Sequence, residues 1–500
     1  MSEKKKNYIA YAVFALLLCW IGVLCFYKLG VKYVDPWDEA RHGVNAYEML
    51  QRGNLFQNTY LYQTDLYNLK PPFSMWCLMV SFALLGAGTF SLRFYSGVCY
   101  LILAVVCGRF VWKRYGKLAS FLTLGLLAAN TTPFAAHMVR AGDADSLYVL
   151  FFTLAMLSML KVSEKQSNLY WCGLFFALAF LTKSYHAFLI VAIGGLFLLV
   201  TGELKKMKPK TWLFFFLSFV IPILVWALPR FAVDGITFFK EMILTDVLGR
   251  ADGTLQNNIQ PFSWYAQYFL GAMSGKLTIY LWLFVIIVAG SFAFPGIFSK
   301  ENWKEHRAEI LGFGMWILIP SLAFSVVSNK LLWYLYPVTI PLILCGAIVL
   351  AKLIEKKELP VLLRSLASVI AIVLIVVFSK DVFKTIQTQT TVAGNEFQNL
   401  VSQLAKENQH AAAYVVYGMD ETGTLDQEWA QQDVFVAEAF GNLLCRQGGY
   451  TAALKEAEES ADSEQILIFV AKSCEVMMVE AAPEAKGVAE TENYIVYALQ

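Results

Sequence analysis

Eight charged side chains are concentrated in the first polar interruption of an otherwise apolar chain. Segment 34–72 holds the carboxylates Asp35, Asp38, Glu39, Glu48 and Asp65 and the cations Arg41, Arg52 and Lys70. Asp38 and Arg41 are three residues apart, so on a helix they project from the same face. A carboxylate there can accept a proton, and a guanidinium can hold a phosphate. The alternative is a salt bridge between these two side chains on a solvated helix.

A second group of charged residues occupies the short turns between later apolar stretches. Arg140, Asp143 and Asp145 stand in one such turn, where Asp143 also suits the N-cap of the following helix. Two carboxylates in one site can divide the roles of base and orienting group. Lys70 and Lys183 either bind phosphate or extend their amines from the bilayer to the membrane surface.

No nucleotide or metal motif accompanies these residues. The chain has no P-loop and no glycine-rich dinucleotide fingerprint. None of its five histidines and nine cysteines stands at a metal-ligand spacing. We therefore predict no obligatory cofactor and no metal ligands, although the acidic groups are numerous enough for a divalent cation.

The composition is that of an integral membrane protein. The chain has 500 residues, of which 58% are hydrophobic and 16% are charged, and its mean hydropathy is +0.53. Soluble domains carry about 25% charged residues. The net charge of +2 says little about partners, and we expect no nucleic-acid partner. Residues 1–6 are basic, and the apolar stretch after them is too long for a signal peptide, so we expect a spanning helix with its N-terminus in the cytoplasm.

Eleven apolar stretches are long enough to cross a bilayer. They fall near 7–29, 90–112, 117–137, 144–161, 168–183, 185–202, 211–231, 275–297, 308–328, 331–351 and 361–380. A twelfth stretch, 73–86, would place the most basic loop outside if it crossed, against the positive-inside rule. We therefore predict that 73–86 lies in or dips into the outer leaflet.

This topology brings the polar segments to one side of the membrane. Loops 34–72 and 232–274 and the turns at 138–146, 182–186 and 328–330 all face outward in it. Residues 1–380 then form a membrane domain, with 34–89 as its first outer loop. Residues 381–500 alternate short apolar runs with helix-like stretches, which predicts a small extracytoplasmic α/β domain. Cys445 and Cys474 lie in this tail, and their pairing is left open.

The polar segments carry an ordered set of motifs. These are DEAR at 38–41, YEMLQRGN at 47–54, KPPFSMW at 70–76, GAGTFSLRFYSG at 86–97 and FLTK at 180–183. As a set they resemble the bacterial membrane glycosyltransferases of the aminoarabinose-transferase and protein O-mannosyltransferase type, which belong to the GT-C superfamily. Three positions depart from the family pattern: His42 replaces a tyrosine, Ser184 a glycine and Asn258 a histidine.

The resemblance implies a sugar donor carried on a polyprenyl phosphate and an extracytoplasmic acceptor, which is a lipid, a cell-envelope glycan or a protein. It implies catalytic carboxylates among Asp38, Glu39, Asp143 and Asp145, with the choice between Asp143 and Asp145 left open. It implies cations for the donor phosphate at Arg41, Lys70, Lys183 and Arg250. It implies a substrate pocket that includes Tyr67, Trp264, Tyr265, Lys330 and Tyr334.

Two other classes of protein remain as alternatives. A transporter or flippase of a lipid-linked or anionic substrate would place charged or broken segments at mid-membrane in paired halves. The charges here cluster at one membrane face, and no repeat of 20–50 residues is visible. A scaffold or sensor would use the tail to bind partners and would leave the charged loops as ordinary surface.

Overall fold

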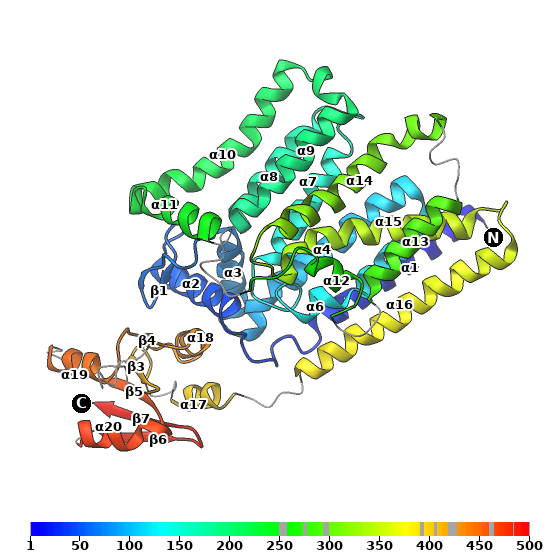
Figure 1. The fold of residues 1–500 in the computed structure, drawn as a ribbon. Coiled ribbons are helices and arrows are strands. Elements are labelled where there is room, and N and C mark those ends of the chain that lie inside the picture. The colour runs from blue at the N-terminus through cyan, green and yellow to red at the C-terminus, as the bar shows by residue number, and fades with distance from the viewer. Residues whose placement is uncertain are drawn as a thin grey trace.

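The computed structural model describes residues 2–249, 258–273, 278–293, 300–390, 395–404, 408–418, 428–459, 465–483 and 485–499. Figure 1 shows a bundle of long helices and, beside α2 (Asp38–Arg52) and β1 (Thr59–Tyr60), a smaller body with a β-sheet. The fold is therefore a polytopic helical domain with a C-terminal α/β domain, as the sequence predicts. Arg250 lies outside the described residues.

The bundle is built from apolar helices, most of which are long. They are α1 (Glu3–Phe26), α4 (Thr89–Tyr115), α5 (Lys117–Ala128), α6 (Thr131–Ala135), α7 (Asp145–Met159), α8 (Asn168–Lys183), α9 (Phe188–Thr201), α10 (Pro209–Asp234), α13 (Ile279–Ala293), α14 (Lys300–Val326), α15 (Tyr336–Glu355) and α16 (Val361–Thr390). Each of the eleven predicted spans contains one of these helices. In the described part of the chain, eight helices are long and apolar enough to cross a membrane. The chain is a multi-pass membrane protein, and the number of crossings remains a prediction.

The stretch predicted to lie in the outer leaflet forms a short helix, α3 (Phe73–Leu85). Its 13 residues span about 20 Å, less than the roughly 30 Å of a bilayer core. Pro72 is its N-cap, where a residue without an N–H group costs little. Helices α7 and α13 in predicted spans are of similar length, so the placement of α3 in the outer leaflet stays a prediction.

Short helices and strands lie at the end of the bundle that is nearest the tail. Besides α2 and β1 they are β2 (Gln63–Thr64), α11 (Thr237–Ile243) and α12 (Trp264–Phe269). Helix α2 ends at Gly53, whose φ of +62° suits glycine. The twelve-residue segment 53–64 returns the chain to Asp65, whose carboxylate accepts two hydrogen bonds from Arg41 on α2.

The tail is a five-stranded sheet with helices on both faces. The strand order is β4-β3-β5-β7-β6, in which β3 pairs in parallel with β4 and β5, and β7 pairs antiparallel with β5 and β6. Its elements are α17 (Glu396–Leu404), β3 (Ala412–Val416), α18 (Gln431–Ala439), β4 (Leu444–Cys445), α19 (Tyr450–Glu459), β5 (Ile466–Ala471), α20 (Glu475–Ala481), β6 (Lys486–Glu490) and β7 (Tyr494–Leu499). Alternate strand residues bury against α17 and α18 on one face and α19 and α20 on the other.

This sheet also separates the two tail cysteines. Cys445 and Cys474 are free and buried, and they belong to the hydrophobic clusters on opposite faces. The pairing that the sequence leaves open is therefore not formed. The domain boundary at residue 380 remains a prediction, and helix α16 itself continues to Thr390.

Helix α18 of the tail packs directly on α2 of the membrane domain. The two helices approach closely at Gly43, where an added Cβ would lie 2.7 Å from the ring of Phe435. Tyr33 donates a hydrogen bond of 2.9 Å to Asp433, which also accepts one of 2.7 Å from Tyr417. The tail is thus held against the helix that carries Asp38 and Arg41.

Two buried carboxyl groups lie in this interface, Glu48 on α2 and Glu438 on α18. Burial raises the pKa of Glu48 to about 7 from an ordinary value of 4.5. Burial, together with the charge of Glu48, raises the pKa of Glu438 well above its ordinary value. An acid whose pKa is higher in the folded protein than in the unfolded protein stabilises the folded state, and this stabilisation is complete at pH values below the pKa in the unfolded protein. The stabilisation is lost as the pH rises through the pKa in the folded protein. The interface is therefore weakest at alkaline pH.

Candidate functional site

Helix α2 begins at Asp38, so its first turn carries two of the charged motif residues. Lys70 lies 3.0 Å from Asp38, which leaves the Asp38 carboxylate paired but still 38% exposed. Burial opposes ionisation of Asp38, but Lys70 and His137 outweigh it and hold the pKa of this carboxyl below its ordinary value. Asp38 is thus ionised at neutral pH and can accept a proton.

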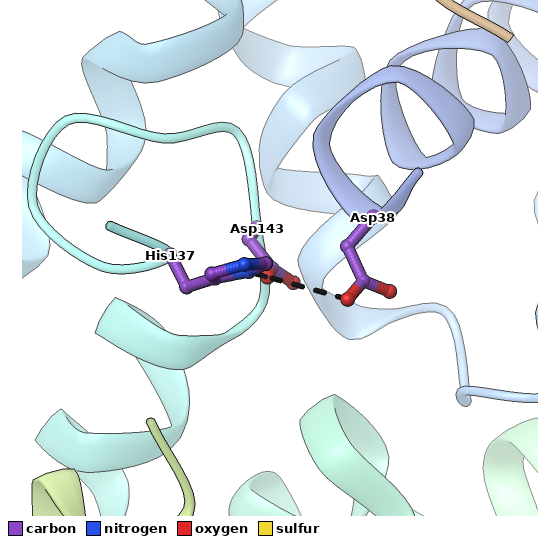
Figure 2. Close-up of side chains that lie close together, drawn as sticks. All are labelled: Asp38, His137 and Asp143. Carbon is purple, nitrogen blue, oxygen red and sulfur yellow. Dashed lines mark hydrogen bonds and ion pairs between the residues drawn. The ribbon is translucent and has the colours of Figure 1, made fainter. Parts of the chain in front are cut away.

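The turn before α7 supplies a second carboxylate. The N-cap of α7 is Ala144 and not Asp143, so the capping role predicted for Asp143 is wrong. Instead Asp143 lies 2.8 Å from His137, whose Nδ1 is 4.0 Å from Asp38. Figure 2 shows these three side chains pointing toward one another from α2 and this turn. Burial would lower the pKa of His137, but the carboxylates raise it, and His137 in turn lowers the pKa of Asp143.

The other acidic residue of the turn has a different partner. Asp145, the first residue of α7, accepts a 2.6 Å hydrogen bond from Lys183, and both side chains are buried. Lys183 ends α8, and its amine lies about 6 Å from the ring centroids of Tyr148 and Tyr334. Lys183 is therefore held inside the protein and does not extend to the membrane surface as a solvated lysine.

Arg41 pairs with Asp65 and not with Asp38. Its Nε and Nη2 donate hydrogen bonds of 2.9 and 2.8 Å to the two oxygens of that carboxylate. The guanidinium lies over two aromatic rings, 3.9 Å from the centroid of Tyr60 and 4.7 Å from that of Tyr67. The two hydrogen bonds to Asp65 and the two ring contacts hold the planar guanidinium in one orientation. A cation fixed in this way suits recognition of a phosphate.

These groups surround one cavity of about 480 Å³. Its lining comes from loop 34–72, the turn before α7, the end of α8 and the segments around 258 and 331–334. The lining residues that carry charge or bind through an aromatic ring include Asp38, Arg41, Tyr67, Lys70, His137, Asp143, Lys183, His186, Trp333 and Tyr334. Segments that are more than 200 residues apart in the sequence thus meet at one site, as expected from the topology.

Three of the lining residues have a backbone conformation that is unusual for their type. Trp37, His137 and Ser184 have φ values of 68°, 57° and 46° although none is glycine. Such conformations cost about 1–3 kcal/mol each and concentrate at functional sites. Ser184 is also the position at which the family pattern has glycine, a residue that adopts positive φ without strain.

Comparisons with known proteins show which families and folds the chain resembles. Residues 69–226 match the family described as dolichyl-phosphate-mannose-protein mannosyltransferase. A protein of Wigglesworthia glossinidia brevipalpis, described as undecaprenyl phosphate-alpha-4-amino-4-deoxy-L-arabinose arabinosyl transferase, is 25% identical over 354 residues. The match covers 67% of this chain and 58% of that protein, so the chain matches less than two thirds of the relative's length.

Solved structures extend the likeness to the whole chain. The crystal structure of ArnT from Cupriavidus metallidurans bound to undecaprenyl phosphate covers 99% of this chain and 98% of its own, with a TM-score of 0.66 and 16% identity. The chain has the GT-C fold. The archaeal oligosaccharyltransferase AglB from Archaeoglobus fulgidus matches 94% of this chain and 70% of its own, with a TM-score of 0.52 and 10% identity. The GT-C resemblance read from the sequence motifs is thereby confirmed.

Glu39 lies outside the cavity lining of this GT-C domain. Its carboxylate accepts hydrogen bonds of 2.8 and 2.7 Å from Arg93 and of 2.7 Å each from the backbone N–H groups of Asp35 and Gly142. Glu39 is 3% exposed and Arg93 is 1% exposed. Glu39 therefore joins the start of α2 to α4 and to the turn before α7, and it does not face the site.

The predicted pocket residues divide into two groups. Tyr67 and Tyr334 line the cavity. Tyr265 donates a 3.0 Å hydrogen bond to the carbonyl of Leu331, and Lys330 donates one of 3.0 Å to that of Gln260, so these two side chains hold the loops around the cavity. Trp264 packs against Tyr265 with ring centroids 4.9 Å apart and is not in the lining.

Sequence reasoning missed two side chains of the candidate site, His137 and Trp333. Their rings stack with centroids 3.6 Å apart, which fixes the imidazole between Asp38 and Asp143. His137 and Trp333 are almost 200 residues apart, and neither belongs to a spacing motif. The one available signal was the position of His137 at the edge of the charged turn before α7.

The same three side chains are the candidate ligands of a divalent cation. Ligand atoms of Asp38, His137 and Asp143 all lie within 4.8 Å of one another. Two carboxylates and an imidazole are an acceptable donor set for such ions. However, the hydrogen bond between His137 and Asp143 holds a proton where a cation would bind, and Lys70 already neutralises Asp38. Metal binding would therefore release a proton and become stronger as the pH rises.

Proposed function

We propose that the chain transfers a sugar from a polyprenyl-phosphate donor to an acceptor outside the cytoplasmic membrane. The observation that carries the proposal is the gathering of Asp38, Arg41, Lys70, Asp143 and Lys183 around one cavity in a GT-C fold. A relative named as an undecaprenyl-phosphate aminoarabinose transferase and a fold relative bound to undecaprenyl phosphate support the class of donor. Whether the sugar is a pentose or a hexose is left open.

The donor must lie with its lipid chain in the bilayer and its phosphate at the level of the headgroups. Arg41, Lys70 and Lys183 supply positive charge at the cavity, and such charge stabilises phosphate increasingly as it becomes the leaving group. The acceptor oxygen forms a bond to the anomeric carbon while the bond from that carbon to the phosphate oxygen breaks. The lipid phosphate leaves with both electrons of that bond, so the transfer needs no nucleotide.

The proton of the acceptor hydroxyl goes to Asp38 in this scheme. Asp38 is ionised and is the more exposed of the two cavity carboxylates, at 38% against 2% for Asp143. Asp143 is held by His137, so we assign it the second acidic role and give Asp145 the role of orienting Lys183. Attack from the face opposite the phosphate inverts the anomeric configuration.

We further propose that the N-terminus is cytoplasmic and that the site and tail are outside. The basic loops then lie inside, which accords with the positive-inside rule. A transporter would need a charged path across the membrane, whereas the charged side chains described here end at one cavity on the side of the tail. The relatives described above are transferases by name, so nothing favours transport.

The decisive experiment uses purified protein and a radiolabelled polyprenyl-phosphate sugar. Asp38→Asn should abolish release of polyprenyl phosphate, because the amide cannot take the acceptor proton, while donor binding persists through the cations. Asp35→Asn is the matched control, since Asp35 pairs with Lys32 and lies outside the cavity.

Two outcomes would contradict the proposal. If Asp38→Asn retained turnover, Asp38 would not be the group that accepts the proton. If the wild-type protein released no polyprenyl phosphate from any labelled sugar donor, the proposed transferase activity would be wrong.

A further inference from the structure

Helices α1, α5 and α16 enclose a groove of about 450 Å³ that shares no lining residue with the cavity around Asp38. Each of the three helices belongs to a segment that is long and apolar enough to cross a membrane. Helix α5 packs on both α1 and α16, and Figure 1 shows α16 along the edge of the bundle. Two lining residues, Trp20 and Val376, are 38% and 46% exposed, so this groove, which we call the α16 groove, opens to the lipid.

The α16 groove is apolar at one end and cationic at the other. Its walls on α1 and α5 carry no charged residue. On α16 the lining residues recur every three or four positions and so form one stripe, in which Ile375 and Val376 come first and Lys380, Lys384 and Gln387 follow. From Ile375 to Gln387 the stripe is about 18 Å long. One leaflet contributes about 15 Å of hydrocarbon, so the groove matches the length of a single leaflet.

The cationic end of the groove lies at the level of the membrane surface. Phe383 stands between the two lysines in sequence, and its ring centroid is 5.6 Å from that of Tyr27, which caps α1. Tyrosine is enriched where acyl chains meet headgroups. Near the end of α16, Gln389 donates a 2.7 Å hydrogen bond to the carbonyl of Ala135, in the segment that leads to the candidate site. The cationic end therefore lies on the same side of the membrane as that site.

The two lysines of the groove are accessible to a ligand. Both are exposed, and within the described part of the chain neither forms an ion pair. Asp381 is the nearest carboxylate in sequence, but it is turned about 100° around the helix from Lys380 and does not line the groove. Lys380 and Lys384 are four residues apart, so their amines can approach one anion together. Two positive charges beside an apolar groove match a lipid with a negatively charged headgroup.

A polyprenyl phosphate fits the α16 groove less well than a phospholipid. Cations for its phosphate are gathered elsewhere, at Arg41, Lys70 and Lys183 in the separate first cavity. Its isoprenoid chain is also much longer than the groove, whereas the acyl chain of a phospholipid extends through one leaflet.

From these observations we infer that the α16 groove is a binding site for an anionic phospholipid. One acyl chain lies along α1, α5 and α16, and the phosphate lies beside Lys380 and Lys384. The lipid comes from the leaflet that faces the candidate site. This inference goes beyond the proposed function and does not depend on sugar transfer.

Photolabelling of the full chain in nanodiscs tests the site. The nanodiscs contain phosphatidylcholine and a small fraction of phosphatidylglycerol that carries a photoreactive group on one acyl chain. The label should appear on the lining segments of α1 and α16, and much less with photoreactive phosphatidylcholine of the same chain length. The double variant Lys380→Gln/Lys384→Gln should lower this labelling about thirtyfold, because each cation near a membrane surface contributes about a factor of five.

The matched control is the double variant Lys205→Gln/Lys208→Gln. It removes two exposed lysines that lie outside the groove, so labelling should equal that of the wild type. Should the Lys380/Lys384 variant fail to fold, Val376→Trp fills the groove from its exposed side while both charges stay, and labelling of α1 should then be lost.

Four results would overturn the inference. They are equal labelling of the groove by photoreactive phosphatidylcholine, full labelling of the Lys380/Lys384 variant, the same loss in the control variant, and displacement of the label by soluble glycerol 3-phosphate. Unlabelled polyprenyl phosphate should compete less well than unlabelled phosphatidylglycerol, and the reverse order would also overturn it.

Discussion

Removal of one partner of the Glu39–Arg93 pair should destabilise the start of α2 strongly. The guanidinium of Arg93 donates to both oxygens of Glu39 and to the carbonyls of Lys32 and Tyr33, and both side chains are almost fully buried. Breaking a buried pair by removing one partner costs about 3–5 kcal/mol, because the other charge is left without compensation. We therefore expect Glu39→Leu to lower the free energy of unfolding by this amount.

The assay is a double-mutant cycle. Unfolding by denaturant is followed for the wild type, Glu39→Leu, Arg93→Met and the double variant. The double variant should be more stable than either single variant, because two apolar side chains of similar size leave no unpaired charge. A Glu39→Leu protein within about 0.5 kcal/mol of the wild type, or a double variant less stable than both single variants, would refute the reasoning.

Turnover of the conservative variant separates a positioning role from a catalytic one. Glu39→Gln keeps the length of the side chain and part of its hydrogen bonding, and Glu39 does not line the cavity. Its rate should fall through misplacement of Asp38, while the pH profile of the rate keeps its wild-type shape. If the rate of Glu39→Gln no longer fell at low pH as that of the wild type does, Glu39 itself would titrate in the reaction. That result would contradict the placement of Glu39 outside the site.

Three further changes test the interface and the donor site. Glu48→Gln removes the buried acid whose pKa is about 7, so its free energy of unfolding should fall less between pH 5 and about 8 than that of the wild type, which loses about 2–3 kcal/mol as this pKa is passed. Gly43→Ala places a methyl group against Phe435 and should cost about 1–3 kcal/mol, seen as faster hydrogen exchange in α18; unchanged exchange would contradict the close packing. Arg41→Lys loses the fork and the aromatic stack and should raise the donor KM about tenfold; an unchanged KM would show that Arg41 does not bind the donor.

The elements of this fold were largely readable from the sequence. A run of about 20 apolar residues has to form a helix inside a bilayer, because no water satisfies its backbone there. All eleven predicted spans contain helices for this reason, and the tail strands at 411–418, 465–471 and 493–499 were found within about two residues of their bounds. Alternation of apolar runs with helix-like stretches also sufficed for the α/β class of the tail.

Side-chain partners could not be read in the same way. Asp38 and Arg41 share a helix face, yet each pairs with a residue of a different segment. Asp143 looked like a helix cap and is a partner of His137 instead. Glu39, adjacent to Asp38 in sequence, points to α4 and not to the cavity.

The sequence by itself determined that the chain is a multi-pass membrane protein with charged motifs in a few polar segments between apolar stretches, since hydropathy and charge act locally along the chain. The motifs added the GT-C fold. Only the tertiary structure decided which carboxylate meets which cation, and that His137 and Trp333 complete the site. It also decided that the tail docks on α2 and that α1, α5 and α16 enclose a groove with two lysines at one end. Those contacts join residues up to about 400 positions apart, and packing of whole helices, which no local pattern encodes, brings them within hydrogen-bonding distance.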